Sequence, residues 1–161
     1  MADSRWLGMV KSIVLLGTCA LSMIAWPQAG DADRVTNQIL AKVRVDEVHA
    51  CAIVKVSFNF PVRYSDHFPF GYGDEVRVRF RPLNVSEDDL GSLDKRETLA
   101  SPRSARAAIG KITYEGDNPA GPTLAIFFRH PVAFKVGQGS DFRSLIIAVS
   151  GPEPMASCVP G

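Results

Sequence analysis

The chain has 161 residues, of which 46% are hydrophobic and 22% are charged, and its formal net charge is +1. This length suits one domain whose core is large enough to fold without a metal or many disulfides. The near balance of 18 basic and 17 acidic residues excludes the broad basic surface expected of a nucleic-acid-binding protein.

Residues 1–30 have the pattern of an export signal. Arg5 and Lys11 give a positively charged start, and the apolar stretch over residues 12–26 is shorter than the roughly 20 residues that a membrane-spanning helix requires. We expect a cleaved signal peptide and a periplasmic protein, with an uncleaved anchor in the inner membrane as the main alternative. Leu16-Gly-Thr-Cys19 also resembles a lipoprotein signal.

Residues 31–38 are polar and are expected to form a linker. From Ile39 to Phe60, apolar residues recur at every second position, interrupted by a turn near Asp46, which indicates strands with one buried and one exposed face. Pro61 cannot donate a hydrogen bond to a sheet and is expected to end the strand or to lie at an edge.

Residues 67–74 contain one proline and two glycines and indicate a loop, and the next strand, residues 75–81, alternates cleanly between apolar residues and arginines. Ser86 opens a capping box that predicts a short helical insertion over residues 86–97. Further strands are predicted over residues 109–114, 124–134 and 145–149. Residues 151–161 carry three prolines and are expected to form a coil tail.

One short passage occurs twice. Residues 54–64 and 124–134 share the pattern Phe-x-x-Pro-Val-x-aromatic, and each continues through a glycine-marked turn into another apolar strand. Residues 40–46 and 109–114 are the expected first strands of the two units. The sequence therefore predicts an all-β fold over residues 39–150: a small antiparallel β-sandwich of two pseudo-symmetric three-stranded units with a short helical insertion.

Two cysteines, Cys51 and Cys158, follow the signal segment. An oxidising compartment favours a disulfide between them, which would tie the end of the chain to the start of the first repeat. A closed loop of about a hundred residues would stabilise the fold by at most roughly 4 to 5 kcal/mol. The alternative is a buried Cys51 and a free thiol in the tail.

The sequence contains none of the familiar catalytic or metal-binding motifs. His49, His67 and His130 lie at no metal-ligand spacing from one another or from a cysteine. The acidic residues at 87–89 are explained by their place at a helix N terminus. We therefore expect no enzymatic activity, no metal and no cofactor.

Two sets of side chains are candidates for ligand binding. Three guanidinium groups on one strand face, from Arg77, Arg79 and Arg81, are suited to anions, although a solvated face or edge protection is the more ordinary explanation of such a pattern. Aromatic residues recur in and before the loop at 67–74, and they indicate a platform for sugar rings or a cover for one end of the sandwich. They are Tyr64, Phe68, Phe70 and Tyr72.

The duplicated pattern resembles the AMIN domain, which occurs at the N terminus of periplasmic amidases and in secretin pilus proteins. The resemblance covers residues 40–150. The segments that carry it are residues 54–64, 109–114, 124–134 and 144–149. It implies a non-catalytic module that binds peptidoglycan and helps to localise envelope machinery.

AMIN proteins usually carry a second domain, so we expect either a free-standing adaptor or part of a longer protein. No binding residue of the family maps onto this sequence. The alternative function is a periplasmic protein–protein interaction or assembly module, whose partner would add a strand to an open sheet edge or cover the aromatic loop. Membrane contact is expected only through an uncleaved N-terminal segment.

Overall fold

The structure, a computed structural model, describes residues 38–48, 51–150 and 158. The expected signal segment, nearly all of the expected linker and most of the expected tail lie outside these residues. Within the part of the chain that the structure describes, no helix is long and apolar enough to cross a membrane.

The described fold consists of strands and a single turn of helix. The elements are β1 (Leu40–Val48), β2 (Cys51–Phe58), β3 (Val62–Phe68), β4 (Tyr72–Pro82), α1 (Glu87–Leu90), β5 (Arg96–Leu99), β6 (Ile109–Glu115), β7 (Thr123–Gln138) and β8 (Ser144–Ser150). All of the strand pairings among them are antiparallel. The prediction of an all-β antiparallel fold is confirmed.

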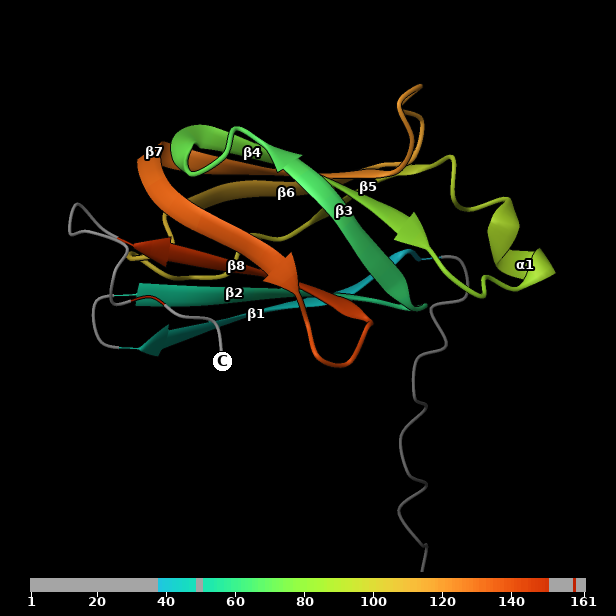
Figure 1. Ribbon diagram of the computed structural model, residues 1–161, viewed down its shortest axis with the longest axis horizontal. Helices are drawn as coiled ribbons and strands as arrows, with labels where there is room; N and C mark the ends of the chain where they lie inside the picture. Colours follow the sequence, from blue (N-terminus) through green and yellow to red (C-terminus); the bar gives the residue numbers. More distant parts are fainter. Residues whose placement is uncertain (1–37, 49–50, 151–157, 159–161) are drawn as a thin grey trace, which may run out of the picture. The chain divides into compact units, whose positions relative to one another are not determined.

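The strands lie in two facing layers that are joined by the long strand β7 (Figure 1). The first half of β7 pairs with β6 and β4, and β5 and β3 complete that layer. The second half of β7 pairs with β8, and β2 and β1 complete the other layer. One sheet therefore folds over on itself, and its two inner faces enclose the core.

Both copies of the repeated passage mark places where the chain crosses between the layers. Pro61 separates β2 from β3, and Pro131 lies within β7 where that strand exchanges partners. β7 pairs with β6 up to Phe128 and with β8 from Ala133 onward. A proline suits such a position because it has no N–H group to donate to either ladder.

Each half of the molecule has one strand segment more than the three that we predicted. The chain continues beyond each crossing proline as a strand of the opposite layer, so β1 to β4 correspond to β6, the two halves of β7, and β8. The halves also interlock, because β8 pairs with β2 and β4 pairs in the equivalent way with β7. Val56 lies opposite Leu145 in the first pairing, and Ile126 lies opposite Val76 in the second.

The segment between the two halves contains much less helix than the predicted insertion over residues 86–97. The helix α1 is a single turn, and Ser86 caps it by accepting a hydrogen bond from the backbone N–H of Asp89. By Arg96 the chain is already in strand β5. Gly91, which follows the turn, weakens any continuation of the helix.

Aromatic rings from both layers meet in the core. The ring centroids of Phe58 and Phe80 are 4.7 Å apart, and those of Phe128 and Phe134 are 5.8 Å apart. Tyr114 is fully buried, and its hydroxyl donates a hydrogen bond to the carbonyl of Leu93. That bond satisfies the polar atom of a ring that otherwise contributes apolar packing.

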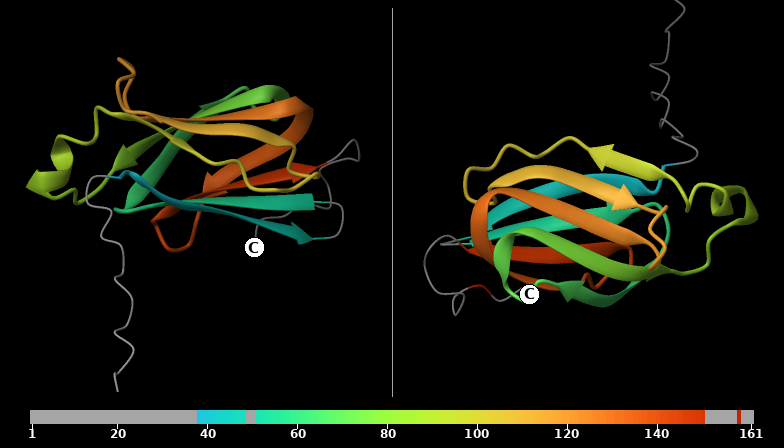
Figure 2. Two further views of the ribbon diagram at one scale, coloured as in Figure 1. Left: turned by 180° about the vertical axis from the view of Figure 1, so that it is seen from behind. Right: turned by 90° about the horizontal axis from the view of Figure 1, so that it is seen from above.

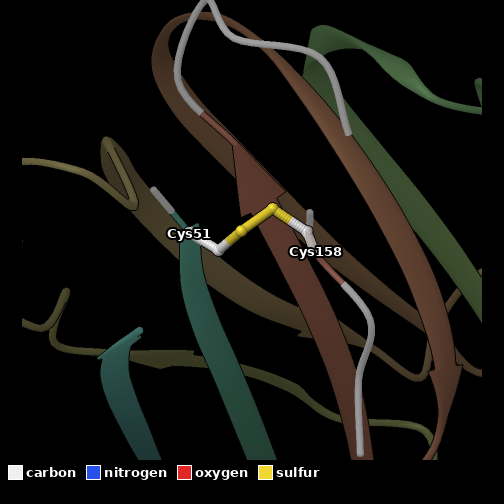
Figure 3. Close-up of a disulfide and its surroundings, with 2 residues drawn as sticks. All are labelled: Cys51 and Cys158. Atoms are coloured by element: carbon white, nitrogen blue, oxygen red, sulfur yellow. A yellow bond between two sulfur atoms is a disulfide. The ribbon is translucent and has the colours of Figure 1, made fainter. Parts of the chain in front are cut away.

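Cys51 and Cys158 form a disulfide with a Cα–Cα distance of 5.9 Å (Figure 3). The bridge starts at the first residue of β2 and extends over β8. Both cysteines are 2% exposed, and they pack against Ala148 and Ile53. The predicted disulfide is confirmed, and it closes a sequence separation of 107 residues.

Asp141 attaches the loop between β7 and β8 to strand β2. Its carboxylate accepts hydrogen bonds from Ser144 Oγ at 2.7 Å and from the backbone N–H of Arg143 at 2.9 Å, and it lies 2.8 Å from Lys55 Nζ. Burial would raise the pKa of Asp141. The bonds from Lys55, Ser144 and Arg143 outweigh that effect and lower the pKa to about 2.

The lowered pKa predicts that Asp141 stabilises the fold at pH values above about 4 and loses this contribution as the pH falls through about 2. Asp141→Asn should lower the free energy of unfolding at neutral pH by about 1 kcal/mol. The loss is small because the Asp141 side chain is 39% exposed, so solvent screens its ion pair. Urea unfolding of both proteins across the acidic range tests this. The difference should shrink as the carboxylate protonates, and a constant difference would contradict the assignment.

Candidate functional site

The three predicted arginines lie on the outer face of β4, between buried residues that point into the core. Val76, Val78 and Phe80 are at most 4% exposed, whereas the side chains of Arg77 and Arg79 are 43% and 53% exposed. The neighbouring strands on this face are β3 on one side and β7, followed by β6, on the other.

Arg77 is held between two carboxylates. Its Nε lies 2.6 Å from Glu75 Oε1, and its Nη1 lies 2.6 Å from Glu115 Oε2. Burial would lower the pKa of Arg77, but the hydrogen bonds and charges of Glu115 and Glu75 outweigh it and raise the pKa. An anionic ligand would therefore have to compete with these carboxylates for Arg77.

Arg79 is also paired with a carboxylate, whereas Arg81 is paired with none among the described residues. Arg79 donates two hydrogen bonds of 2.7 Å to the carboxylate of Asp66, and these bonds, with the charge of Asp66, raise the pKa of Arg79. Arg81 is exposed and lies opposite Arg63 of β3. Neither the Arg81 nor the Arg63 guanidinium forms a hydrogen bond or ion pair with another described residue. In the described fold, they form an unpaired basic cluster at the β3 side of this face.

The carboxylates that pair with the arginines were not predicted as part of the site. Glu115 on β6 is only 7% exposed and also lies 3.8 Å from Arg96, which in turn lies 3.2 Å from Asp117. Asp66 comes from β3. Their sequence positions gave no sign of the pairing, because strand alternation indicates which face a residue occupies but not which strand lies beside it.

Exposed aromatic rings surround the tip of the β3–β4 hairpin. Phe68, Phe70 and Tyr72 are 69%, 80% and 67% exposed. The rings of Phe68 and Phe70 are arranged edge to face with centroids 6.2 Å apart, and a cis peptide bond joins Phe68 to Pro69. The carbonyl of Gly71 accepts a 2.9 Å hydrogen bond from the backbone N–H of Phe134, which ties the tip to β7.

Tyr64 does not join the exposed rings, and it lies half-buried against the core. Its hydroxyl and His67 Nδ1 share a hydrogen bond of 2.6 Å, and its backbone N–H donates to Gln138 Oε1 at 2.7 Å. Burial, followed by the charge of Asp66, raises the pKa of Tyr64. Tyr64 therefore supports the hairpin from below.

His67 is the contact between this support and the exposed tip. Its ring centroid is 5.9 Å from that of Phe70 and 6.3 Å from that of Phe134. Burial lowers the pKa of His67, against smaller opposing effects of Phe70 and Asp66. A neutral imidazole suits a position between two phenylalanine rings.

A trough connects the arginines with the aromatic hairpin. It consists of three adjoining depressions of about 310, 210 and 300 Å³ along the outer face of β4. The first two share Asp66, Arg79 and Ala120, and the second and third share Phe68 and Arg77. The loop between β6 and β7 forms one wall. The trough thus joins Arg77, Arg79 and Arg81 to Phe68 of the aromatic hairpin.

Ion pairs between arginines and carboxylates form much of the polar lining of this surface. In the part of the chain that the structure describes, no group of three or more histidine, cysteine and acidic side chains is placed to hold a metal ion. Asp66 and Glu75 of the trough are paired with Arg79 and Arg77, whereas Asp74 forms no ion pair with another described residue. His49, one of the three histidines considered from the sequence, lies outside the described residues.

Comparison with known protein families, with characterised proteins and with solved structures finds no match to this chain. The fold and the trough therefore define it only as an all-β protein with a candidate binding surface.

Proposed function

We propose that the protein is a non-catalytic module of the cell envelope that binds peptidoglycan through the β3–β4 hairpin and the adjoining trough. The observation that carries the proposal is the exposure of Phe68, Phe70 and Tyr72, each at least two-thirds exposed on one hairpin. Clustered apolar rings on a protein surface usually mark a binding site, since leaving them in water is unfavourable. Aromatic rings are suited to packing against the apolar faces of sugars.

The trough divides the recognition of a peptidoglycan strand between two chemistries. The exposed rings would contact the glycan, and the basic end of the trough would bind the carboxylates of the peptide stems. Because Arg77 and Arg79 already hold carboxylates of the protein, Arg81 and Arg63 are the cations that are free to bind the ligand first. This assigns the largest electrostatic contribution to the Arg81 end.

Two features support a location in the envelope. The disulfide is compatible with an oxidising, exported compartment. The duplicated Phe-x-x-Pro-Val pattern resembles the AMIN domain, and that resemblance implies wall binding and the localisation of envelope machinery. The partners in this function are peptidoglycan and, through it, the envelope proteins that act on the wall.

The test is co-sedimentation of the full, disulfide-bonded chain with purified peptidoglycan sacculi over a salt series. Replacing Phe68, Phe70 and Tyr72 together by alanine should weaken binding by about tenfold or more, because such anchors dominate the energy of a binding surface. Phe142→Ala is the matched control, since this ring is 59% exposed but lies in the β7–β8 loop. It should leave binding unchanged.

The arginines give a second arm of the same test. Arg81→Ala should reduce binding and its dependence on salt more than Arg77→Ala does, because Arg77 is already paired with two glutamates. Absence of wild-type sedimentation at every salt concentration would exclude wall binding. A salt-insensitive, stoichiometric complex with an envelope protein, without retention on sacculi, would establish the alternative function of a protein-interaction module.

A further inference from the structure

Strand β1 has an open edge. β1 pairs with β2 along one side, and no strand among the described residues pairs with its other side (Figure 2). Near its start, the backbone N–H groups of Ile39 and Leu40 donate to the carboxylate of Glu97. From Lys42 to Val48, the backbone of the described chain forms hydrogen bonds to β2 alone. Within the described fold, this edge is open to another strand.

The other free edges of the sheet are less suited to pairing. β5 has only four residues. β3 carries an irregularity between Tyr64 and Asp66, and such a bulge disrupts the regular spacing of donors and acceptors. β1 is regular after Lys42, since the shift in its register lies between Leu40 and Lys42. The segment from Lys42 to Val48 is therefore the longest regular open edge in the described fold.

The charges along this edge are complementary to themselves. Lys42 and Arg44 precede Asp46, and all three side chains are exposed on the outer face. None of the three forms an ion pair with another described residue. Val43 and Val45, which alternate with them, are half-buried on the inner face. A second β1 in antiparallel orientation would present its acidic end to the basic end of the first.

Only one register uses these charges without conflict. Registers that shift the pairing by one residue would place the half-buried valines opposite exposed charges, on the wrong face of the sheet. In a symmetric pair of β1 strands, a twofold axis at Arg44 would place two arginines opposite each other. An axis at Asp46 would place two aspartates opposite each other. With Val45 on the axis, each Arg44 lies opposite the Asp46 of the second copy, and each Lys42 lies opposite Val48. Each Val43 then lies opposite Glu47, whose carboxylate already accepts a hydrogen bond from Ser104.

We propose that the protein forms a twofold-symmetric dimer in which β1 pairs antiparallel with β1 of a second copy, with Val45 at the axis and two Arg44–Asp46 pairs across it. The layers that contain β1 join into one continuous sheet, and the interface is isologous. β1 and β3 are at opposite ends of the strand order, so the trough and the aromatic hairpin remain free. A dimer would present two such surfaces to one extended ligand, which raises its overall affinity.

The experiment measures self-association of the full, disulfide-bonded chain by sedimentation velocity over a concentration series. Wild type should form a dimer. Arg44→Asp places two aspartates opposite each other at both symmetry-related positions, and Asp46→Arg places two arginines there. Each variant alone should associate roughly tenfold more weakly than wild type, since like charges directly opposite are destabilising.

An equimolar mixture of the two variants gives the decisive result. In a dimer of one Arg44→Asp chain and one Asp46→Arg chain, an aspartate faces an arginine at both symmetry-related positions, so association should return to the wild-type level. Lys135→Asp, an exposed charge reversal on β7, is the control and should leave association unchanged. Any association through residues that the structure does not describe is common to all these proteins and cannot produce this pattern.

A monomeric wild type, or two single variants that associate as strongly as wild type, would overturn the dimer. Weakened single variants whose mixture fails to recover would overturn the proposed register. Far-ultraviolet circular dichroism and thermal unfolding of each variant verify that the fold is retained. These outcomes do not depend on peptidoglycan, so they are separate from the test of wall binding.

Discussion

Replacing Cys51 and Cys158 together by alanine is expected to lower the free energy of unfolding by about 4 kcal/mol. The bridge spans 107 positions, and the entropy that a crosslink removes from the unfolded chain grows with the length of the closed loop. Small domains have a total stability of roughly 5–15 kcal/mol, so this loss is a large part of it. Urea unfolding of the variant and of oxidised wild type measures the difference.

Reduction of wild type supplies the control for this prediction. The reduced protein and the double alanine variant should unfold at closely similar urea concentrations, because both lack the crosslink while keeping the same strands. If the variant loses less than about 1 kcal/mol, the unfolded chain is not constrained by the bridge in the way that the loop-length argument requires.

Phe134→Ala is expected to cost about 3–5 kcal/mol of unfolding free energy. Phe134 is 1% exposed, stacks on Phe128 with centroids 5.8 Å apart and contacts His67 below the aromatic hairpin. Its removal leaves a cavity at the point where β7 enters the second layer. Urea unfolding of wild type and of the variant measures this cost, and the slope m should be the same for both proteins.

Phe142→Ala is the matched control for the core substitution. Phe142 is the same residue type but is 59% exposed, so its truncation should change the free energy of unfolding by less than about 0.5 kcal/mol. Equal losses at the two positions would show that Phe134 is not part of the packed core. A selective loss at Phe134 with weakened sacculus binding would connect core packing to the hairpin above it.

The fold class follows from sequence patterns because burial on one face imposes a period of two on each strand. The repeated Phe-x-x-Pro-Val passage and the cysteine pair were also informative, and the disulfide predicted from that pair is present. The number of strands in each half was harder to predict. A proline interrupts ladder pairing whether the chain turns away or crosses to another layer, so Pro61 and Pro131 alone could not distinguish these outcomes.

The candidate site was predictable in part for a similar reason. Even spacing placed Tyr64 with Phe68, Phe70 and Tyr72, but the irregularity in β3 between Tyr64 and Asp66 changes the alternation. Tyr64 therefore shares the inner side with His67, and Asp66 is brought to the outer face beside Arg79. A bulge of this kind depends on pairing with β4, which is a tertiary property. The pairing of Arg77 with Glu115 depends in the same way on β6, whereas Glu75 lies two positions earlier in β4 itself.

The interlocked pairing of the two halves also determines the order in which the domain can be completed. Cys51 lies opposite Ser150 in the ladder between β2 and β8. Strand β2 therefore lacks one of its two neighbouring strands until β8, the last strand described, is in place. Contacts between residues so far apart in the chain slow folding, because the chain loses the entropy of loop closure before these contacts stabilise it. Neither half has a complete layer of its own, and a chain emerging from a ribosome would lack a complete domain until β8 had appeared.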